Sequence, residues 1–383
     1  MVRVARLSEF PWFLLSAAGL LVALGWLGIG RSEWLRLQVT GASGHYLRQQ
    51  VIYSSFGLLL LCVVGSIDYR RWRRWAYVAY AVGLGLLVVV YFFPAIKGAH
   101  RWIRVGPVGF QPSEFVKLAF VVAMARYLMY RDNFRRLRGL LPPLVLAFVP
   151  LILILREPDL GMSLVFVPVL FAMLLVAGAR ATDLGVLLLL GLCLTPVVWS
   201  QMTGEQRSRI ASLFDQPSPG QHVSDNAYHL YQAKRMLALG GTSGSWLAGE
   251  ASDDATAYHL PEARTDFIFC VLGERLGLWG LGLLLVLYGV LVVCGARIAA
   301  QSRDPFGRLV ATGVVAVMAV QVVINTAMTV GLLPITGLSL PMVSYGGSGL
   351  AAHAIGLGLL TSIATHPGYE MSDEPFRYLV DGA

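Results

Sequence analysis

An aspartate stands where a polar segment meets a long apolar run. Asp266 is followed by Phe-Ile-Phe-Cys and by an apolar stretch that continues to Cys294. A carboxylate at such a boundary is poorly solvated on one side, which raises its pKa and its basicity. Asp before an apolar run is also a common helix N-cap, so a general base and a cap both remain open. Other carboxylates compete with it, although they lie in what reads as a solvated loop: Glu250, Asp253, Asp254 and Glu262.

Residues 111–117 combine a helix start with a carboxylate and an amine. Gln111 is followed by Pro-Ser-Glu, and proline in the first turn with Ser113 and Glu114 is typical of a helix N-terminus. Glu114 and Lys117 are three positions apart, so they share one helix face and can pair. Two interpretations stay open: a structural ion pair, or Lys117 binding an anion while Glu114 holds it in position.

A cationic segment precedes this helix. It reads Gly98-Ala-His-Arg-Trp-Ile-Arg104, so Arg101 and Arg104 lie on either side of Trp102. An indole in this position serves either as an interfacial anchor or as a wall against a lipid head group.

Two more segments are candidates for the border of the same site. Asp159, in Glu-Pro-Asp-Leu-Gly before an apolar run, is expected to cap a helix or to line the cavity. The stretch Gly331–Ser348 contains prolines and glycines that prevent a regular membrane helix. Non-helical backbone at membrane depth is tolerated where it lines a protein cavity or a water-filled one. We therefore expect a re-entrant loop beside the site.

Composition identifies the setting of these residues as a membrane. Apolar residues make up 56% of the 383 residues and charged residues only 14%. The mean hydropathy is +0.65. A soluble chain of this length needs more polar surface to cover its core. Because the apolar blocks are near the length that crosses about 30 Å of hydrocarbon, each is expected to be a helix.

The apolar blocks predict about ten transmembrane helices in one all-α polytopic domain that comprises residues 1–383. The expected spans are Phe10–Ile29, Val51–Ile67, Trp75–Phe93, Phe115–Met129, Leu141–Leu155, Leu160–Val176, Leu184–Trp199, Phe267–Cys294, Leu309–Val330 and Gly346–Ile363. A long segment of about 200–265 separates the seventh span from the eighth and is expected outside the cytoplasm.

Charge asymmetry supports ten spans with both termini in the cytoplasm. Cytoplasmic gaps carry an excess of Lys and Arg. With the N-terminus inside, the even gaps hold Arg70, Arg71, Arg73, Arg74, Arg131, Arg135, Arg136, Arg138, Arg180, Arg297, Arg303 and Arg308. The first, fifth and ninth gaps hold only Arg31, Arg36, Arg48 and Arg156.

Two outer segments carry cations against this rule. Around the third gap lie Lys97, Arg101, Arg104 and Lys117, and in the long outer segment lie Arg207, Arg209, Lys234, Arg235 and Arg264. Long translocated loops largely ignore the rule, which is an alternative explanation for the second group. It explains the short third gap poorly. Cations retained on this side indicate an anion there, and phosphate at the outer membrane surface fits.

Several other chemistries find no support in the sequence. The four cysteines lie in apolar runs without the spacing of a zinc site, so no metal-ligating residues are predicted. The sequence contains no Walker loop, dinucleotide glycine pattern or nucleophile elbow. We therefore expect neither an organic cofactor nor nucleic acid as a partner.

The chain resembles the SEDS family (shape, elongation, division and sporulation). The matching segments occur in family order and spacing: Gly98-Ala-His-Arg-Trp-Ile, Gln111-Pro-Ser-Glu with Lys117, Pro158-Asp-Leu-Gly161, Pro261-Glu-Ala-Arg-Thr-Asp-Phe-Ile-Phe269, Gly331-Leu-Leu-Pro and Ser344-Tyr-Gly-Gly-Ser348. One departure is Arg264, at a position where the family usually has His. The substitution keeps a hydrogen-bond donor and adds a permanent charge.

The resemblance implies a peptidoglycan glycosyltransferase that polymerises lipid II on the outer face of the bacterial cytoplasmic membrane. Family precedent makes the aspartate of Thr-Asp-Phe-Ile-Phe, here Asp266, the essential carboxylate. The residues expected to bind substrate are Arg101, Trp102, Gln111, Ser113, Glu114, Lys117, Asp159, Arg209, Thr265, Ser344 and Tyr345. The sequence Gly-Leu-Leu-Pro-Ile-Thr-Gly and the short tails favour the elongation type, which is RodA-like, over the division type, which is FtsW-like.

The implied partners are lipid II, the growing lipid-linked glycan, membrane lipids and a class B penicillin-binding protein. A divalent cation, Mg²⁺ or Mn²⁺, would be bound with the substrate diphosphate. The rival function is a flippase or other transporter of lipid-linked oligosaccharides. Such a protein would also have a basic cavity, broken helices and carboxylates at the membrane edge.

Overall fold

Long helices run side by side through the structure, which is a computed structural model. It describes residues 10–41, 44–95, 99–105, 108–130, 137–193, 195–213, 225–249, 258 and 260–366. The bundle contains α1 (Trp12–Thr40), α2 (Tyr46–Ser66), α3 (Arg70–Val89), α4 (Pro112–Leu128), α5 (Leu141–Arg156), α6 (Leu160–Ala177), α7 (Ala181–Cys193), α8 (Thr195–Gln201), α12 (Ile268–Gln301), α13 (Pro305–Val330) and α14 (Gly347–Thr365). The 3₁₀ turns η1 (Val90–Phe92) and η3 (Leu137–Leu140) flank two of them.

The predicted all-α polytopic architecture is confirmed, and each of the ten expected spans falls on a helix. Among the described residues, seven helices are long and apolar enough to cross a membrane: α1, α2, α3 with η1, α6, α12, α13 and α14. Helices α5 and α7 are shorter apolar helices. The seventh expected span falls on both α7 and α8. The number of crossings and the cytoplasmic position of both termini stay predictions.

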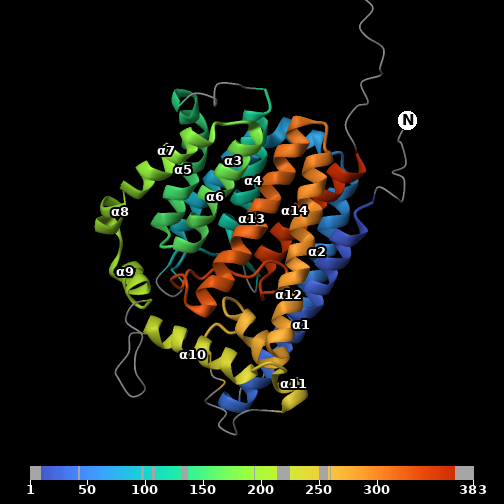
Figure 1. Cartoon of the computed structure of the whole chain (residues 1–383), viewed down its shortest axis with the longest axis vertical. Coiled ribbons are helices and arrows are strands. Elements are labelled where there is room, and N and C mark those ends of the chain that lie inside the picture. Colours follow the sequence, from blue (N-terminus) through green and yellow to red (C-terminus); the bar gives the residue numbers. More distant parts are fainter. Residues whose placement is uncertain are drawn as a thin grey trace, which may run out of the picture.

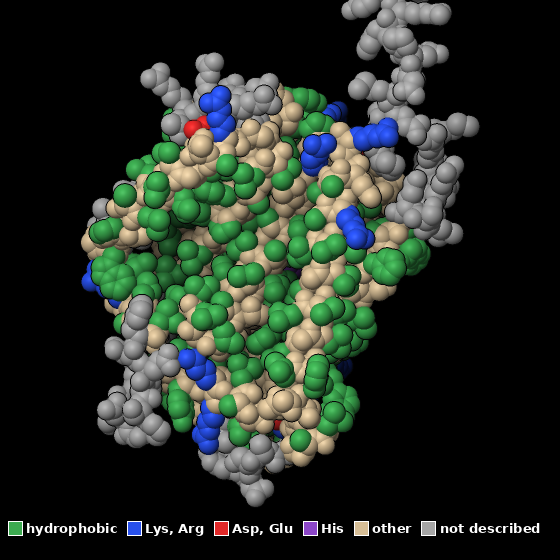
Figure 2. All heavy atoms as spheres, viewed as in Figure 1, with side chains coloured by type: hydrophobic (Ala, Val, Ile, Leu, Met, Phe, Trp, Pro, Cys, Tyr) green, Lys and Arg blue, Asp and Glu red, His purple; other side chains and the backbone are tan. Residues whose placement is uncertain are grey.

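The surface of the bundle is apolar, as a lipid-facing surface must be. Figure 2 shows hydrophobic side chains over the whole middle of one face, with most of the visible Lys and Arg toward its two ends. Large apolar side chains are strongly exposed; Phe13 is 80% exposed and Phe92 84%. In water such a surface would be unfavourable, so the bilayer is its natural solvent.

Helix α1 extends well beyond the predicted end at Ile29, because its second half is fastened to α12. The Arg31 guanidinium makes a bidentate ion pair with Glu274, with distances of 2.7 Å from Nη2 to Oε1 and 3.0 Å from Nε to Oε2. The Arg31 guanidinium also lies 4.4 Å from the centroid of the Trp34 ring. Charged residues can thus continue a helix where they are paired across the packing interface.

The segment between the seventh and the eighth expected spans contains three helices in its described part. They are α9 (Gly204–Ala211), α10 (Asp225–Gly240) and α11 (Gly244–Ala248), and they lie at one end of the bundle in Figure 1. Threonine and glutamine form a capping box at the start of α9, through Thr203 and Gln206. Helix α10 approaches α12 so closely that a Cβ at Gly240 would lie 2.1 Å from the carbonyl oxygen of Gly273.

A small β-hairpin is an element that the sequence analysis missed. Strands β1 (Ile103–Val105) and β2 (Val108–Phe110) pair antiparallel, with Ile103 opposite Phe110 and Arg104 opposite Gly109. Apolar residues alternate with Arg104 and Gly109 along the two strands, which is the period of a strand. A Cβ at Gly109 would lie 3.2 Å from the indole of Trp102, so the ring packs directly on the hairpin.

Some residues discussed above lie outside the described residues: Lys97, Arg131, Arg135, Arg136, Glu250, Asp253 and Asp254.

Candidate active site

One cavity, of about 980 Å³, collects most of the predicted site residues. Its walls come from the hairpin, the start of α4, the turn between α5 and α6, the turn before α12 and the loop between α13 and α14. The predicted residues that line it are Arg101, Trp102, Gln111, Glu114, Asp159, Arg209, Thr265, Asp266, Ser344 and Tyr345. Two predicted residues, Ser113 and Lys117, do not line it.

Asp266 lies in the turn that precedes α12, and its side chain is half-buried in the cavity wall. The N-cap position of α12 is occupied by Phe267, which makes no side-chain cap bond. Asp266 therefore does not serve as the cap that its sequence position allowed. Its carboxylate is directed to the cavity, where a substrate can reach it.

The pKa of Asp266 is raised to about 7. Removal of the carboxylate from water is the main cause, and the negative charges of Glu262 and Asp159 add to the shift. The Arg101 guanidinium and a hydrogen bond from Thr265 act in the opposite direction. A carboxylate with a pKa near neutrality is matched to general-base work at physiological pH.

Asn325 of α13 holds the turn that carries Asp266. Its side-chain nitrogen donates to the carbonyl oxygen of Asp266 at 2.8 Å and to that of Leu338 at 2.6 Å. Asn325 is fully buried. One amide thus joins the turn before α12 to the loop between α13 and α14.

The loop between α13 and α14 is non-helical, as the prolines and glycines predicted, and it lines the cavity. Gly337 has a positive φ of 72°, and a Cβ there would lie 3.6 Å from Oδ2 of Asp266. Ser344 donates from its hydroxyl to the carbonyl oxygen of Thr265 and accepts from the N–H of Leu340 at 2.8 Å. These bonds place the loop directly against the Asp266 turn.

Gln50 of α2 secures the far end of this loop, a role that the sequence did not indicate. Its side chain donates to the carbonyl oxygen of Ser344 at 3.2 Å and accepts from the N–H of Gly346 at 3.1 Å. Gln50 is buried. Tyr345 is then presented to the cavity, where its hydroxyl donates to Gln49.

Asp159 fulfils both interpretations that the sequence left open. Its Oδ1 accepts from the N–H of Met162 at 3.1 Å as the N-cap of α6, and the residue also lines the cavity. Burial raises the pKa of Asp159, while Arg101 and the hydrogen bond from Met162 lower it. The residue therefore contributes a second carboxyl group close to Asp266.

Arg101 is held by the turn between α5 and α6. Its guanidinium donates to the carbonyl oxygens of Glu157, at 3.1 Å, and of Pro158, and Nε lies 3.7 Å from Oδ2 of Asp159. Burial, with the charge of Asp159 second, raises the pKa of the neighbouring Glu157 carboxyl to about 8, while Arg101 lowers it. A single arginine thus partly neutralises a group of buried carboxyls.

Glu114 and Lys117 form the predicted ion pair, 2.8 Å between Oε2 and Nζ. Their side chains are 2% and 3% exposed, and only Glu114 lines the cavity. The amine of Lys117 lies behind Glu114 and does not line this cavity, and its contact with a substrate anion stays a prediction. Ser113 is fully buried and likewise has no access to the cavity.

Among the other residues on the cavity wall, the charged residues and histidines that were not predicted as site residues are Arg104, His229, Glu262, Arg264 and His353. Glu262 was expected in a solvated loop, and this prediction is wrong because the residue lines the cavity. Its Oε2 accepts from the hydroxyl of Thr265 at 3.1 Å, one residue before Asp266. A spacing of four residues from Asp266 within a turn was the available signal for this proximity.

Arg264 adds a cation supported by aromatic rings. Its guanidinium lies 3.9 Å from the ring centroid of Tyr46 and 5.8 Å from that of Tyr345. Its carbonyl oxygen accepts from the N–H of Tyr345 at 2.9 Å. Arg264, Arg101, Arg104 and Arg209 place guanidinium groups, which suit a phosphate, on a wall that also carries the carboxylates of Glu114, Asp159, Glu262 and Asp266.

Within the described part of the chain, no group of three or more His, Cys, Asp or Glu residues has the arrangement of a metal site. The carboxylates on the cavity wall are also engaged with Lys117, Met162 and Thr265. A divalent cation would therefore depend on the substrate for most of its oxygen ligands.

Comparisons with known proteins identify the family of this chain. The family model described as "Cell cycle protein", which covers FtsW, RodA and SpoVE, matches residues 11–369. The peptidoglycan glycosyltransferase MrdB of Escherichia coli strain K12 is 36% identical over 344 residues, which are 86% of this chain and 89% of the relative. Stage V sporulation protein E of Bacillus subtilis is 33% identical over 333 residues, 85% of this chain and 88% of the relative.

Solved structures show the same fold. A chain from a structure titled "Structural coordination of polymerization and crosslinking by a peptidoglycan synthase complex" has a TM-score of 0.78 and 30% identity, with 94% of this chain and 98% of that chain covered. The rod shape determining protein RodA of Thermus thermophilus has a TM-score of 0.69 and 27% identity, with 94% and 98% covered. The chain therefore belongs to the FtsW, RodA and SpoVE family, the SEDS family that its motifs resemble.

Proposed function

We propose that this membrane protein polymerises lipid II into glycan strands, with Asp266 as the general base. Its relatives are named peptidoglycan glycosyltransferases, and a glycosyltransferase activity on peptidoglycan precursors follows from the family. The observation that supports the role of Asp266 is its position on the wall of a cavity lined by several arginines. Its carboxylate has a raised pKa and does not cap α12.

The reaction needs one base and no acid. The anomeric carbon of lipid II carries a diphosphate, which is already a good leaving group, in contrast to the poor leaving group of glycoside hydrolysis. The acceptor hydroxyl transfers its proton to the Asp266 carboxylate while its oxygen attacks the anomeric carbon. The bond from that carbon to the diphosphate oxygen breaks, the diphosphate leaves with the electron pair, and the configuration inverts.

Arginines of the cavity wall stabilise the charge that develops on the leaving diphosphate. Arg101 and Arg209 were expected in this role, and Arg104 and Arg264 join them on the wall. Lys117 acts indirectly, because its ammonium group pairs with the Glu114 carboxylate and holds it in position. A divalent cation, Mg²⁺ or Mn²⁺, would add positive charge at the diphosphate when bound with it.

The site is proposed to face the extracytoplasmic side of the bacterial cytoplasmic membrane. The positive-inside rule supports this orientation, because the arginine-rich gaps lie at the other ends of the helices. A class B penicillin-binding protein is the proposed partner, and the similarity to a chain of a polymerising and crosslinking complex supports it. The Gly331-Leu-Leu-Pro-Ile-Thr-Gly337 sequence favours elongation over division.

Polymerisation of purified lipid II tests the proposal. The wild type is compared with Asp266→Asn, with and without partner and divalent cation, and products are resolved by gel electrophoresis. A general base contributes roughly 10²–10⁴-fold, so Asp266→Asn should make almost no polymer while it still binds lipid II. The matched control is Asp183→Asn, which removes a carboxylate from α7, away from the cavity.

Each outcome has a definite meaning. Polymer from wild type and Asp183→Asn, and none from a folded Asp266→Asn, supports the base. Equal polymer from all three removes Asp266 from the mechanism. No polymer from any of them, with lipid II moved across vesicle membranes instead, supports the flippase alternative, which tolerates the substitution better.

A further inference from the structure

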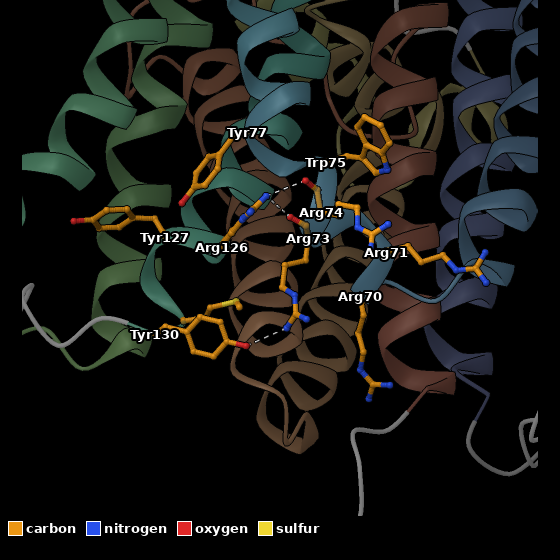
Figure 3. Close-up of a pocket in the computed structure, with 10 residues that line it drawn as sticks. Arg70, Arg71, Arg73, Arg74, Trp75, Tyr77, Arg126, Tyr127 and Tyr130 are labelled. Carbon is orange, nitrogen blue, oxygen red and sulfur yellow. Dashed lines mark hydrogen bonds between the residues drawn. The ribbon is translucent and has the colours of Figure 1, made fainter.

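A second pocket lies between α3 and α4, at the other end of α4 from the active site. Figure 3 shows the residues that line it. Helix α4 lines both sites, with Glu114 at the active-site cavity and Arg126 at the pocket, and these 12 positions correspond to about 18 Å along the helix axis. The pocket has a volume of about 960 Å³. Its lining is strongly basic and aromatic: Arg70, Arg71, Arg73, Arg74, Trp75, Tyr77, Arg126, Tyr127, Met129 and Tyr130.

Two of these arginines are held in place. Arg126 Nη1 donates to the carbonyl oxygens of Arg73 at 2.8 Å and Arg74 at 2.9 Å, as Figure 3 shows. The Arg126 guanidinium also lies 4.6 Å from the ring centroid of Tyr77. Arg73 Nη1 donates to the hydroxyl of Tyr130 at 3.2 Å. The guanidinium groups of Arg73 and Arg126 are therefore held in defined positions on the pocket wall.

The lining of the pocket is rich in cations in the described part of the chain. Among the residues that the structure describes, no carboxylate lines it. The nearest ion pair joins Arg70 to Asp68, with 3.6 Å between Nη1 and Oδ2, and both side chains are about one-third exposed. The positive-inside rule accounts for arginines at this end of a helix, but it does not require five of them around one concave site.

The surface next to the pocket is apolar and exposed, which is typical of a lipid-facing surface. Trp75, Val78 and Val82 follow the arginines along α3 and are 60%, 50% and 57% exposed. Arginine binds phosphate oxygens through paired N–H groups, and basic pockets between transmembrane helices bind anionic lipid head groups. An exposed apolar strip that begins at the pocket offers a path for acyl chains, which a soluble phosphate compound would not need.

We propose that this arginine pocket of α3 and α4 binds the head group of an anionic glycerophospholipid. The phosphate lies among the arginines and the acyl chains follow the exposed face of α3. The site is separate from the one proposed for glycan polymerisation, since none of its residues lines the active-site cavity.

Native mass spectrometry of the delipidated full-length protein tests the proposal. The probes are cardiolipin, zwitterionic phosphatidylcholine and, as a phosphate source without acyl chains, inorganic pyrophosphate. The variant Arg73→Gln/Arg74→Gln is compared with Arg303→Gln/Arg308→Gln, a control that removes two exposed arginines next to the start of α13. Cardiolipin affinity should fall roughly fivefold for each pocket arginine removed, with little change in the control.

Thermal melting in detergent gives a second readout. Cardiolipin should raise the melting temperature of the wild type and the control and have a much smaller effect on the pocket variant. Equal loss of lipid binding in both variants would overturn the proposal, because the effect would then come from total charge. Unchanged cardiolipin binding by the pocket variant would also overturn it. A third contrary result would be pyrophosphate binding that depends on the pocket arginines, together with no preference for cardiolipin over phosphatidylcholine.

Discussion

The side-chain amide of Asn325 donates a 2.8 Å hydrogen bond to the backbone carbonyl of Asp266, although 59 positions separate the two residues. The same nitrogen donates to Leu338 at 2.6 Å. The buried helix α13 thereby sets the position of the candidate base relative to the loop that covers it. Asn325 does not line the cavity, so it acts as a positioning residue.

Replacement of Asn325 by Ala should lower kcat and leave KM for lipid II nearly unchanged. Loss of a buried donor leaves two carbonyl oxygens without this partner, at about 1–3 kcal/mol, which corresponds to roughly a 5- to 150-fold slower reaction if the loss falls on the transition state. Steady-state kinetics measure both constants. Thr326→Ala is the matched control, because Thr326 bonds only within α13, to the carbonyls of Val322 and Val323. A change in KM alone would contradict the positioning role.

The rate of polymerisation should rise with pH through about 7 and then level off. The base must be ionised to accept a proton, and the pKa of Asp266 is raised to about 7, first by burial and then by Glu262 and Asp159. Below this pH most of the enzyme carries a protonated, inactive Asp266. Initial rates between pH 5.5 and 8.5 at saturating lipid II check the profile. A rate that is flat over this range would be inconsistent with Asp266 as the titrating base.

Arg101→Gln should shift the midpoint of that pH profile to higher pH. The guanidinium lowers the pKa of Asp266, and its loss leaves the burial and the neighbouring carboxylates unopposed. At pH 7 the variant is therefore less active, and part of the activity returns at higher pH. Arg104→Gln is the comparison, since it removes another cation of the cavity wall that is not among the causes of the Asp266 shift. Identical midpoints for both variants would refute the electrostatic role of Arg101.

The Glu114–Lys117 pair should be far more sensitive to loss of one partner than to loss of both. Its side chains are 2% and 3% exposed, so Glu114→Gln leaves a buried ammonium without its counter-charge. Such single removals cost about 3–5 kcal/mol, whereas an apolar replacement of both groups is often nearly neutral. Thermal melting of Glu114→Gln, Lys117→Met and the double variant forms a double-mutant cycle. Additive losses would show that the pair is not coupled.

Local sequence patterns were sufficient for the helices and for several local contacts. Apolar blocks predicted membrane helices because hydrocarbon leaves the backbone no partner but itself. The i,i+3 spacing predicted the pairing of Glu114 with Lys117, and the apolar run after Asp159 predicted its cap at α6. Proline and glycine predicted the non-helical loop before α14. In each case the interacting groups lie within one or two turns of one another along the chain.

The tertiary structure decided what no local pattern contains. It brings Glu262, expected in a solvated loop, to the cavity wall. It also places Lys117 behind Glu114, whereas the sequence left both an ion pair and an anion contact possible for Lys117. It further lets the Asn325 amide bond to the carbonyl of Asp266 and stacks the Arg264 guanidinium on the ring of Tyr46. These contacts join residues far apart in sequence, and they depend on how whole helices pack. The sequence alone therefore determined a membrane protein with a candidate base, and packing of the helices determined which side chains share the cavity with it.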